Sequence, residues 1–510
     1  MNTADPWLGV AETIDDSVRR HRRERPDAVA FVGLGRELTW AQLDAAADRA
    51  ASDLARRGIG VGSRVGWLGS NDIGFPILLL AAWRRRAALA GLNWRLTADE
   101  LRRTIENVEL DLVIADVDLG ELAQSFQADE SRILVLGPRT EIPWSSSSVA
   151  DDATLIPEPD DVALFWFTSG STGLPKAAAI GRARNELAQY ERTSCEMTTE
   201  TTALVVPPVF HVAGSCWVQY GLSRGAKVVF TSDSTPQGLL TALEGHNVTH
   251  ALMVPTLIQM VLQSMNDETA AKLSLEHIGY GTSPIPEKIL RAALEVFKCR
   301  FSQIYGLTEA GGVVAQLEPA DHELEGPHPT RYLATGRPFA GNQIEIWDPF
   351  SGVPVPAGVE GQIMIKSPSV MLGYWQGDGL TADPISPDQW VATGDMGYLN
   401  DEGYLYVVGR ADDMIITGGE NVQPAEVEAV LLEMPGVVEC AVFGLPDEVW
   451  GQRVSAAVVA SESMDPEEVR LYCRERLAHF KCPKDIRILD ELPRNATGKI
   501  LRGRLKQVSA

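Results

Sequence analysis

The sequence lacks any pattern of cysteines that could act as a framework. Only six cysteines occur among 510 residues, and none forms a C-x-x-C pair. A disulfide scaffold and a cysteine-bound zinc site are therefore not expected, and the composition fits reduced thiols in the cytoplasm. Because the chain is longer than a single hydrophobic core usually supports, we expect at least two domains.

Positive charge and long apolar runs are also scarce. Lys and Arg number 45 against 69 Asp and Glu, a formal net charge of −24, so nucleic acid is not an expected partner. The acidic N-terminus lacks the basic and apolar regions of a secretion signal, which favours a cytoplasmic protein. The most apolar segment, residues 73–83, is too short to span a bilayer and is followed by three arginines. We expect no transmembrane segment, and we predict that residues 73–83 form a buried helix with a charged end.

Helix and strand patterns alternate along the N-terminal part of the chain. Apolar residues at helical spacing precede short strand-like runs repeatedly, within residues 38–69, 100–116, 238–255 and 288–306. This order is typical of an α/β fold with parallel sheets and crossover helices. From about residue 336, short strands between Pro and Gly turns predict a small β-barrel or sheet. Two helix-plus-strand units then predict a small α+β domain, so we divide the chain into domains 1–411 and 412–510.

The stretch "TSGSTGLPK", residues 168–176, directly follows the apolar run "VALFWF". It is not a Walker A loop, because Pro175 stands where that motif requires glycine. Its glycines still allow the backbone to approach an anion, and its hydroxyl groups and lysine suit phosphate oxygens. The stretch therefore indicates a phosphate-binding loop, with a mobile surface turn as the alternative.

Five further motifs follow or flank this loop in a fixed order. They are "NWRLTADEL" at 93–101, "QIYGLTEAGG" at 303–312, "TGD" at 393–395, "GRADDMI" at 409–415 and "PRNATGK" at 493–499. Together with the loop they resemble the adenylate-forming superfamily, in its branch of acyl-CoA synthetases and acid:CoA ligases. The resemblance covers nearly the whole chain.

The resemblance implies a particular reaction. In this family a carboxylate attacks the α-phosphate of ATP, pyrophosphate leaves, and a thiol, usually that of coenzyme A, captures the acyl-adenylate. ATP, Mg²⁺ and coenzyme A are the implied cofactors, and a hydrophobic carboxylic acid, either a medium- or long-chain fatty acid or an aryl acid, is the implied substrate. A homodimer is left open.

Charged residues that match the family's motifs receive roles from the resemblance. Lys499 matches the lysine that stabilises negative charge in adenylation, and Glu309, beside Thr308, matches the magnesium ligand together with Thr168. Asp395 is expected to accept hydrogen bonds from the ribose hydroxyls, with Arg410 against the same sugar. Taken alone, a lysine near a C-terminus is usually solvated, and a T-G-D tripeptide is usually a turn.

The nucleotide itself is expected to contact the phosphate loop and an adenine pocket. Tyr305 would stack on adenine, with an ordinary core tyrosine as the alternative. The remaining nucleotide-binding positions implied by the resemblance are Ser169, Gly170, Ser171, Thr172, Gly173, Lys176, Gly281, Thr282, Ser283 and Gly306.

The acid pocket and the acceptor side are predicted in the same way. His211 in "PPVFHVAGS" matches the family's gate at the acyl pocket, although a lone histidine beside valines is often a core residue. Asp412 falls at the family's hinge, about which the C-terminal domain would move as a lid. Gly418 and Gly419 resemble the segment that lines the pantetheine tunnel, and a β-turn is the alternative.

Two departures from the family pattern bear on the acceptor. Ala177 stands where glycine is common, and Gln362 stands where glutamate is frequent. We therefore keep a non-CoA acceptor, such as a carrier protein or an amine, as an alternative. A catalytically inactive nucleotide-binding module and a luciferase-like oxygenase are alternatives of other classes.

Overall fold

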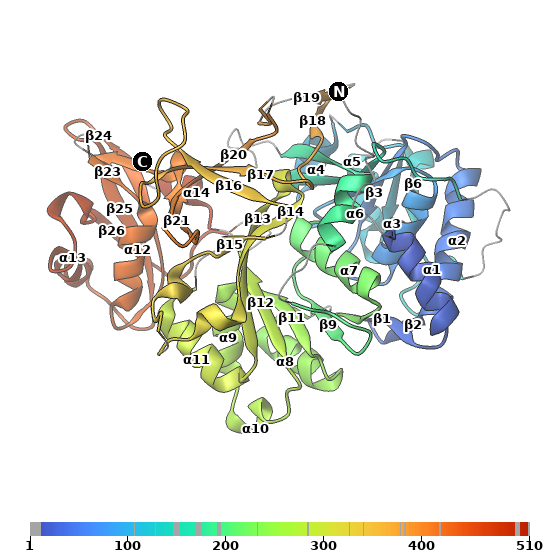
Figure 1. Ribbon diagram of the computed structural model, residues 1–510, viewed down its shortest axis with the longest axis horizontal. Coiled ribbons are helices and arrows are strands. Elements are labelled where there is room, and N and C mark those ends of the chain that lie inside the picture. Colours follow the sequence, from blue (N-terminus) through green and yellow to red (C-terminus); the bar gives the residue numbers. More distant parts are fainter. Residues whose placement is uncertain are drawn as a thin grey trace. The chain divides into compact units, whose positions relative to one another are not determined.

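The computed structural model of the chain separates into two compact units (Figure 1). Unit 1 comprises residues 1–343 and 365–391, and unit 2 comprises residues 344–364 and 392–510. The structure describes residues 12–106, 108–127, 129–145, 154–168, 175–190, 195–231, 233–282, 285–325, 327–339, 341–377, 379–381, 384–386, 388–417, 420–494 and 500–507.

An eight-stranded sheet in unit 1 has the order β19-β18-β8-β7-β4-β3-β5-β6. Its strands are β3 (Arg64–Leu68), β4 (Ala88–Gly91), β5 (Leu112–Ala115), β6 (Ile133–Val135), β7 (Val162–Thr168), β8 (Lys176–Gly181), β18 (Gly373–Gln376) and β19 (Gly379–Thr381). The strands from β7 to β6 pair in parallel, whereas β7, β8, β18 and β19 pair antiparallel. The antiparallel part carries both ends of the expected phosphate loop.

A nine-stranded sheet in unit 1 has the order β15-β14-β13-β12-β11-β9-β10-β1-β2. Its strands are β1 (Val29–Gly33), β2 (Arg36–Thr39), β9 (Thr202–Val205), β10 (Lys227–Phe230), β11 (His250–Met253), β12 (His277–Gly281), β13 (Arg300–Leu307), β14 (Gly312–Leu317) and β15 (Arg337–Pro338). Its central strands are parallel and its edges are antiparallel. The predicted parallel sheets with crossover helices are confirmed.

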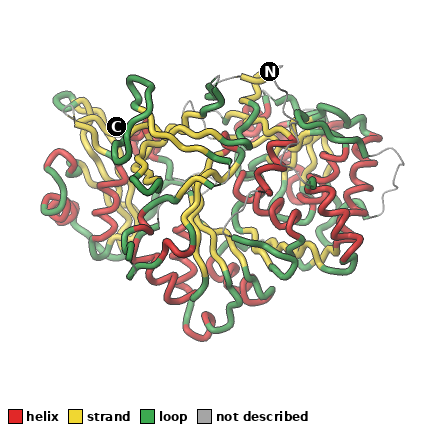
Figure 2. The backbone as a smooth tube through the Cα atoms, viewed as in Figure 1, coloured by secondary structure: helices red, strands yellow, loops and turns green. Residues whose placement is uncertain are grey.

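Helices lie against the strands in both units (Figure 2). In unit 1 they are α1 (Ile14–Glu24), α2 (Trp40–Arg56), α3 (Gly74–Arg84), α4 (Ala98–Ile105), α5 (Gly120–Phe126), α6 (Arg182–Tyr190), α7 (Val212–Arg224), α8 (Pro236–Gly245), α9 (Pro255–Ser264), α10 (Asp267–Ala270) and α11 (Glu287–Phe297). Thr13, Thr39 and Thr97 cap α1, α2 and α4 through reciprocal hydrogen bonds with the third residue of each helix.

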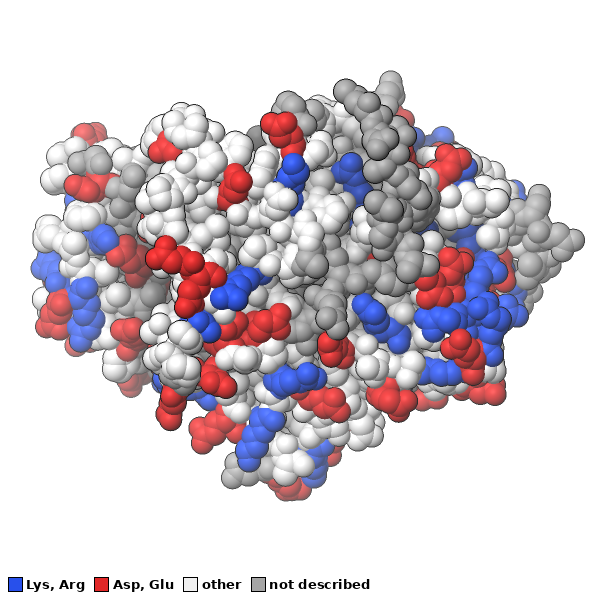
Figure 3. Space-filling view, in the orientation of Figure 1, with Lys and Arg blue, Asp and Glu red and all other residues white. Residues whose placement is uncertain are grey.

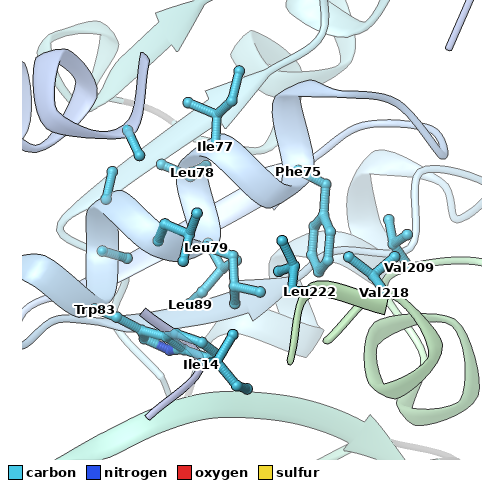
Figure 4. Packing of buried hydrophobic residues seen from close by; sticks show 14 of the residues in the cluster. Ile14, Phe75, Ile77, Leu78, Leu79, Trp83, Leu89, Val209, Val218 and Leu222 are labelled. Atoms are coloured by element: carbon cyan, nitrogen blue, oxygen red, sulfur yellow. The ribbon is translucent and has the colours of Figure 1, made fainter. Parts of the chain in front are cut away.

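Helix α3 is the predicted buried helix at residues 73–83, and every residue in it is buried. Figure 4 shows Phe75, Leu79 and Trp83 from α3 packed with Ile14 and Leu222 from other helices. The helix ends at Arg84, as the predicted charged end requires, and Arg84 is buried as well. Three carboxylates surround its guanidinium group. None of the described helices is both long and apolar enough to cross a bilayer.

The described residues of unit 2 form two sheets and three α-helices. The four-stranded sheet has the order β16-β17-β20-β21, and the five-stranded sheet has the order β23-β22-β25-β24 with β26 beside β25. The strands are β16 (Gln343–Trp347), β17 (Gly361–Lys366), β20 (Val391–Leu399), β21 (Leu405–Arg410), β22 (Ile415–Thr417), β23 (Glu420–Val422), β24 (Val437–Asp447), β25 (Gly451–Ala460) and β26 (Asp485–Leu489). The helices are α12 (Pro424–Glu433), α13 (Pro466–Arg474) and α14 (Arg502–Gln507).

Short 3₁₀ helices connect several of these elements. They are η1 (Val117–Leu119), η2 (Glu130–Arg132), η3 (Thr308–Ala310), η4 (Pro319–His322), η5 (Arg331–Leu333), η6 (Ala411–Asp413) and η7 (His479–Lys481). The body predicted as a small barrel is the four-stranded sheet, and its contacts place most of it in unit 2. The domain boundary after residue 411 and the mobility of the C-terminal domain stay predictions.

Candidate active site

The expected phosphate loop connects two antiparallel strands of unit 1. Thr168 ends β7, Lys176 begins β8, and the two residues are directly opposite each other in the strand register. Lys176 is exposed, whereas the residues of β7 from Ala163 to Trp166 are buried. The two ends of the loop are therefore held side by side by paired strands. The predicted residues Ser169, Gly170, Ser171, Thr172 and Gly173 lie outside the described part of the chain.

The expected adenine pocket lies where two parallel strands of the nine-stranded sheet end. Gly281 in β12 is opposite Ile304 in β13, which brings Thr282 and Tyr305 to the same edge of the sheet. A Cβ atom at residue 281 would lie 2.5 Å from the carbonyl oxygen of Ile304, so a side chain does not fit there. Tyr305 is half-buried rather than a core tyrosine, and Thr282 is exposed with a φ of 71°. Ser283 lies outside the described residues.

Glu309 stands on a tight turn that follows β13. Glycine is required at Gly306, because a Cβ atom there would lie 2.0 Å from the carbonyl oxygen of Gly312. The turn η3 begins at Thr308, whose carbonyl oxygen accepts a hydrogen bond from Gly311 N at 3.0 Å. Cα atoms of η3 lie within 8 Å of Cα atoms of β7, so the Glu309 turn and the stem of the phosphate hairpin are neighbours.

A tyrosine connects the two expected charged groups. The hydroxyl of Tyr374 in β18 donates a hydrogen bond to Glu309 Oε1 at 2.6 Å. The ammonium nitrogen of Lys176 lies 4.9 Å from the centre of the Tyr374 ring. The structure therefore brings Lys176 and Glu309 together through one side chain.

The oxygen donors at this place suit a magnesium ion. Within the described residues, no group of three or more His, Cys, Asp or Glu side chains is arranged to hold a metal. Mg²⁺ does not need such a cage, because it is commonly bound by one or two carboxylates together with waters and the phosphates of a nucleotide. Glu309, with Tyr374 on one of its carboxylate oxygens, fits that mode. No described group favours a softer metal here.

His211 lies at the N-cap of α7, next to the expected acid pocket. Burial, with a smaller effect from the positive charge of Arg95, lowers the pKa of His211 to about 4. Its Nε2 atom is shielded from solvent and has no hydrogen-bond partner among the described residues. At neutral pH the imidazole is uncharged, so it can shape a pocket or donate a hydrogen bond but cannot act as a fixed cation.

Small residues surround the start of α7. A Cβ atom at Gly214 would lie 2.3 Å from the carbonyl oxygen of Pro208, and one at Gly312 would lie 3.7 Å from Cys216 Sγ. The helix and β14 are in contact, so Gly312 faces α7. Trp217 and Tyr220 are buried in the core of unit 1.

The expected ribose-binding residues form a pair in unit 2. Asp395 in β20 is directly opposite Arg410 in β21, and Arg410 Nη1 lies 3.0 Å from Asp395 Oδ1. The hydroxyl of Thr393 donates to Ile363 O at 2.8 Å and accepts from Asp395 N at 3.0 Å. These bonds fix the Asp395 backbone, while 41% of the Arg410 side chain remains exposed. A partly solvated ion pair of this kind can exchange partners when a sugar hydroxyl approaches.

Most of the residues expected on the acceptor side, and the lysine expected to act in adenylation, lie outside the described part of the chain. Asp412 lies within η6, but its side chain is outside the described part of the structure. Gly418, Gly419 and Lys499 also lie outside the described residues. Their assigned roles stay predictions.

Sequence reasoning missed the residues of the segment 367–376 that hold the Glu309 turn. Ser369 Oγ donates to Ala310 O at 3.0 Å, and Arg184 Nη1 donates to Val370 O and Met371 O at 2.8 and 3.0 Å. The only local signal was an aromatic pair in a short strand-like run, "GYW" at 373–375. That signal does not show which distant carboxylate the tyrosine contacts.

Comparison with known proteins agrees with this geometry. The chain is 32% identical to a fatty acid–[acyl-carrier-protein] ligase of Streptomyces coeruleorubidus, covering 97% of this chain and 96% of that protein. It is 34% identical to a feruloyl-CoA synthase of Amycolatopsis sp., covering 96% and 97%. The o-succinylbenzoate CoA synthetase of Bacillus subtilis has solved structures with an acyl-adenylate intermediate and with ATP and magnesium. These match with TM-scores of 0.84 and 0.83 and identities of 27% and 28%, covering 96% of this chain and 97% and 99% of those chains.

Family comparison assigns both parts of the chain. Residues 18–375 match the AMP-binding enzyme family, and residues 426–499 match the AMP-binding enzyme C-terminal domain. The resemblance inferred from the motifs is confirmed over nearly the full length. The chain belongs to the AMP-binding enzyme family.

Proposed function

We propose that the protein is an ATP-dependent ligase that activates a hydrophobic carboxylic acid and transfers it to coenzyme A. The acid would be a medium- or long-chain fatty acid or an aryl acid. The relatives named for fatty acid, ferulate and succinylbenzoate ligation support an acid with an apolar body. A neutral His211 beside small residues at the start of α7 suits such a body better than a second charged group.

One observation carries this proposal. The lysine that follows the hydroxyl-rich loop and the carboxylate of the Glu309 turn meet at Tyr374, although they are 133 positions apart in the chain (309 minus 176). A cation beside a metal-binding carboxylate is the arrangement needed to hold the phosphates of a nucleotide with its magnesium.

The reaction assigns a task to each group. ATP supplies the α-phosphate that the acid oxygen attacks, and pyrophosphate leaves. Lys176 and the backbone and hydroxyl groups of residues 168–173 bind the phosphates, Glu309 and Thr168 hold Mg²⁺, and Asp395 with Arg410 binds the ribose. We propose that residues 412–510 form a lid that brings Lys499 to the α-phosphate and, after movement about Asp412, exposes the thiol path lined by Gly418 and Gly419.

A carrier protein is the second candidate acceptor. The relative from Streptomyces coeruleorubidus is named for an acyl-carrier-protein acceptor, and it covers almost the whole chain. Ala177, one of the two departures, is buried in β8 between Phe167 and Trp375. It supports the hairpin stem and does not by itself distinguish coenzyme A from a carrier.

Exchange of labelled pyrophosphate into ATP tests the first step. We expect exchange that depends on a carboxylic acid, measured over a panel from octanoate to palmitate and from benzoate to ferulate. Lys499→Ala should lower the exchange rate by about 100-fold or more, because the developing negative charge loses its counter-charge. Lys506→Ala is the matched control: this exposed lysine of α14 should tolerate the change with exchange near the wild-type rate.

The acceptor is then tested with the best acid. Coenzyme A and a phosphopantetheinylated carrier protein are offered separately, and thioester formation is followed by mass spectrometry. Thioester with coenzyme A supports the proposal, and thioester only with the carrier supports the alternative. Absence of exchange with every acid, together with retained ATP binding, would favour an inactive nucleotide-binding module.

A further inference from the structure

The segment 367–376 is fixed against the backbone of the Glu309 turn. Met371 N donates to Glu309 O at 2.9 Å, and Ser369 Oγ donates to Ala310 O at 3.0 Å. A Cβ atom at Gly311 would lie 2.0 Å from Ser369 O, so the two backbones touch at that point. The position of the segment therefore determines the position of Glu309.

The same segment is joined to the phosphate hairpin. Leu372 N donates to Ala179 O at 2.8 Å, and β18 pairs antiparallel with β8 so that Tyr374 is opposite Ala178. Ala178 is two residues from Lys176 in β8, which places Lys176 and Tyr374 on one face of the sheet as diagonal neighbours. The segment 367–376 thus connects the strand that carries Lys176 with the turn that carries Glu309.

The side chain of Tyr374 contacts both Glu309 and Lys176. Its hydroxyl reaches Glu309 Oε1 at 2.6 Å, and its ring lies 4.9 Å from Lys176 Nζ. A donor on Oε1 holds the carboxylate in one orientation and leaves Oε2 available to a cation. The ring face attracts the ammonium group and limits the directions that the flexible lysine side chain can take.

We propose that Tyr374 is a positioning residue that orients Glu309 for the metal and Lys176 for the phosphates of bound nucleotide. This inference rests on the proposed function, because it takes Glu309 as the metal ligand. Tyr374 acts through these two neighbours. Removal of its hydroxyl should therefore affect the metal, and removal of its ring should also affect the nucleotide.

The test measures nucleotide affinity with and without metal, using the full-length protein. The probe is α,β-methylene-ATP, alone or as its preformed complex with Mn²⁺, titrated by calorimetry. Tyr374→Phe keeps the ring over Lys176 and loses the hydroxyl. We expect the gain in affinity that Mn²⁺ provides to fall by about tenfold, the lower end of the effect of losing a group that orients a metal ligand. The affinity for metal-free nucleotide should stay near the wild-type value.

Two further variants complete the comparison. Tyr374→Leu also loses the ring, so the affinity for metal-free nucleotide should fall in addition. Trp375→Phe is the matched control: it alters the next residue of β18, whose ring packs edge-on against Phe165, and it should leave both affinities unchanged. In pyrophosphate exchange with the best acid, the Mg²⁺ concentration required for half-maximal rate should rise in both Tyr374 variants. It should stay unchanged in Trp375→Phe.

These measurements distinguish failure of the inference from failure of the proposed function. A wild-type gain from Mn²⁺ in folded Tyr374→Phe would overturn the inference, even if wild-type protein exchanges pyrophosphate normally. A reduced gain without exchange by any acid would support the inference and contradict the proposed ligase. If Tyr374→Phe does not fold, Glu309→Gln decides: it keeps Tyr374, and a retained Mn²⁺ gain in this variant would equally overturn the inference.

Discussion

Arg84 shows how a single charged side chain is held inside the core of unit 1. Its side chain is 1% exposed, and its guanidinium nitrogens lie 2.7 Å from Asp15 Oδ1, 2.5 Å from Asp44 Oδ1 and 2.8 Å from Asp48 Oδ1. Burial alone would lower the pKa of Arg84, but Asp15 and Asp44 outweigh burial and raise it. Buried charges persist only when paired in this way. The cluster joins α1, α2 and α3.

Replacing Arg84 by methionine tests this cluster. The change leaves three neighbouring carboxylates with only the partly exposed Arg19 and Arg22 as cations, so we expect the free energy of unfolding to fall by about 3–5 kcal/mol. Guanidinium chloride unfolding followed by tryptophan fluorescence measures the loss. Arg57→Met is the control, because Arg57 pairs with Asp53 at the surface and should cost less than about 1 kcal/mol. Equal losses in the two variants would contradict the account.

Elements were predictable from the sequence where their signals are local. The helix at 40–56 has its cap, its apolar spacing and a glycine stop within one window, and the sequence predicts it. The strand ends that carry Gly281 and Tyr305 follow from the helix-then-strand order. The contacts of Arg84 and Tyr374 could not be predicted, because the partners are distant in the sequence. The partners of Arg84 lie 36 to 69 residues away, and Glu309, the partner of Tyr374, lies 65 residues away. Only the packing of three helices brings Arg84 to its partners, and only the pairing of β18 with β8 brings Tyr374 beside the Glu309 turn.

Helix α7 depends on a glycine in its first turn. A Cβ atom at Gly214 would lie 2.3 Å from Pro208 O and 2.4 Å from Pro207 O. These are backbone atoms, so α7 itself must shift to make room, and His211 at its N-cap would move with it. The glycine thus serves close packing at the expected acid pocket.

Gly214→Ala should therefore destabilise the protein by about 1–3 kcal/mol and raise the KM for the acid more than that for ATP. Thermal unfolding and exchange kinetics give the two quantities. Gly245→Ala is the matched control in α8, where no atom beyond the chain neighbours and the backbone of the helix itself lies within 4 Å of the new Cβ. That change should be neutral or stabilise by up to about 1 kcal/mol. If both variants behave alike, close packing at Gly214 is not important.

At the scale of the whole molecule, mild acid reduces the net negative charge, and this reduction should not destabilise the folded protein. The formal net charge is −24 at pH 7, and acidic and basic side chains are interspersed on the face drawn in Figure 3. As the pH falls toward the isoelectric point near 4.8, the net negative charge and its self-repulsion decrease. A loss of stability over this range must then come from buried groups that gain protons on unfolding.

Three buried histidines of the nine-stranded sheet region are such groups. His250 in β11 is opposite His277 in β12, with ring centres 5.8 Å apart, and His322 Nε2 lies 3.0 Å from the hydroxyl of Tyr280. Burial is the main cause that lowers the pKa of each, to about 3 for His277 and about 4 for His322. All three are neutral in the folded protein at neutral pH.

The sign of the resulting pH dependence follows from proton binding. An unfolded histidine titrates near pH 6.5, so below that value the unfolded chain binds protons that the folded protein excludes. The free energy of unfolding should fall as the pH drops from about 6.5 to 5, by up to about 1.4 kcal/mol per pH unit for each histidine. Burial raises the pKa of Asp48, Asp116 and Glu186, and these carboxyls act in the opposite direction.

His277→Gln separates the histidine effect from that of the carboxyls. His277 Nε2 contacts Ser302 Oγ at 2.8 Å, a contact that an amide can also make. Urea unfolding at pH 7.0, 6.0 and 5.0 should show a shallower pH dependence for this variant than for wild type, because one excluded proton is gone. Parallel curves for wild type and His277→Gln would show that acid sensitivity arises elsewhere than in this strand pair.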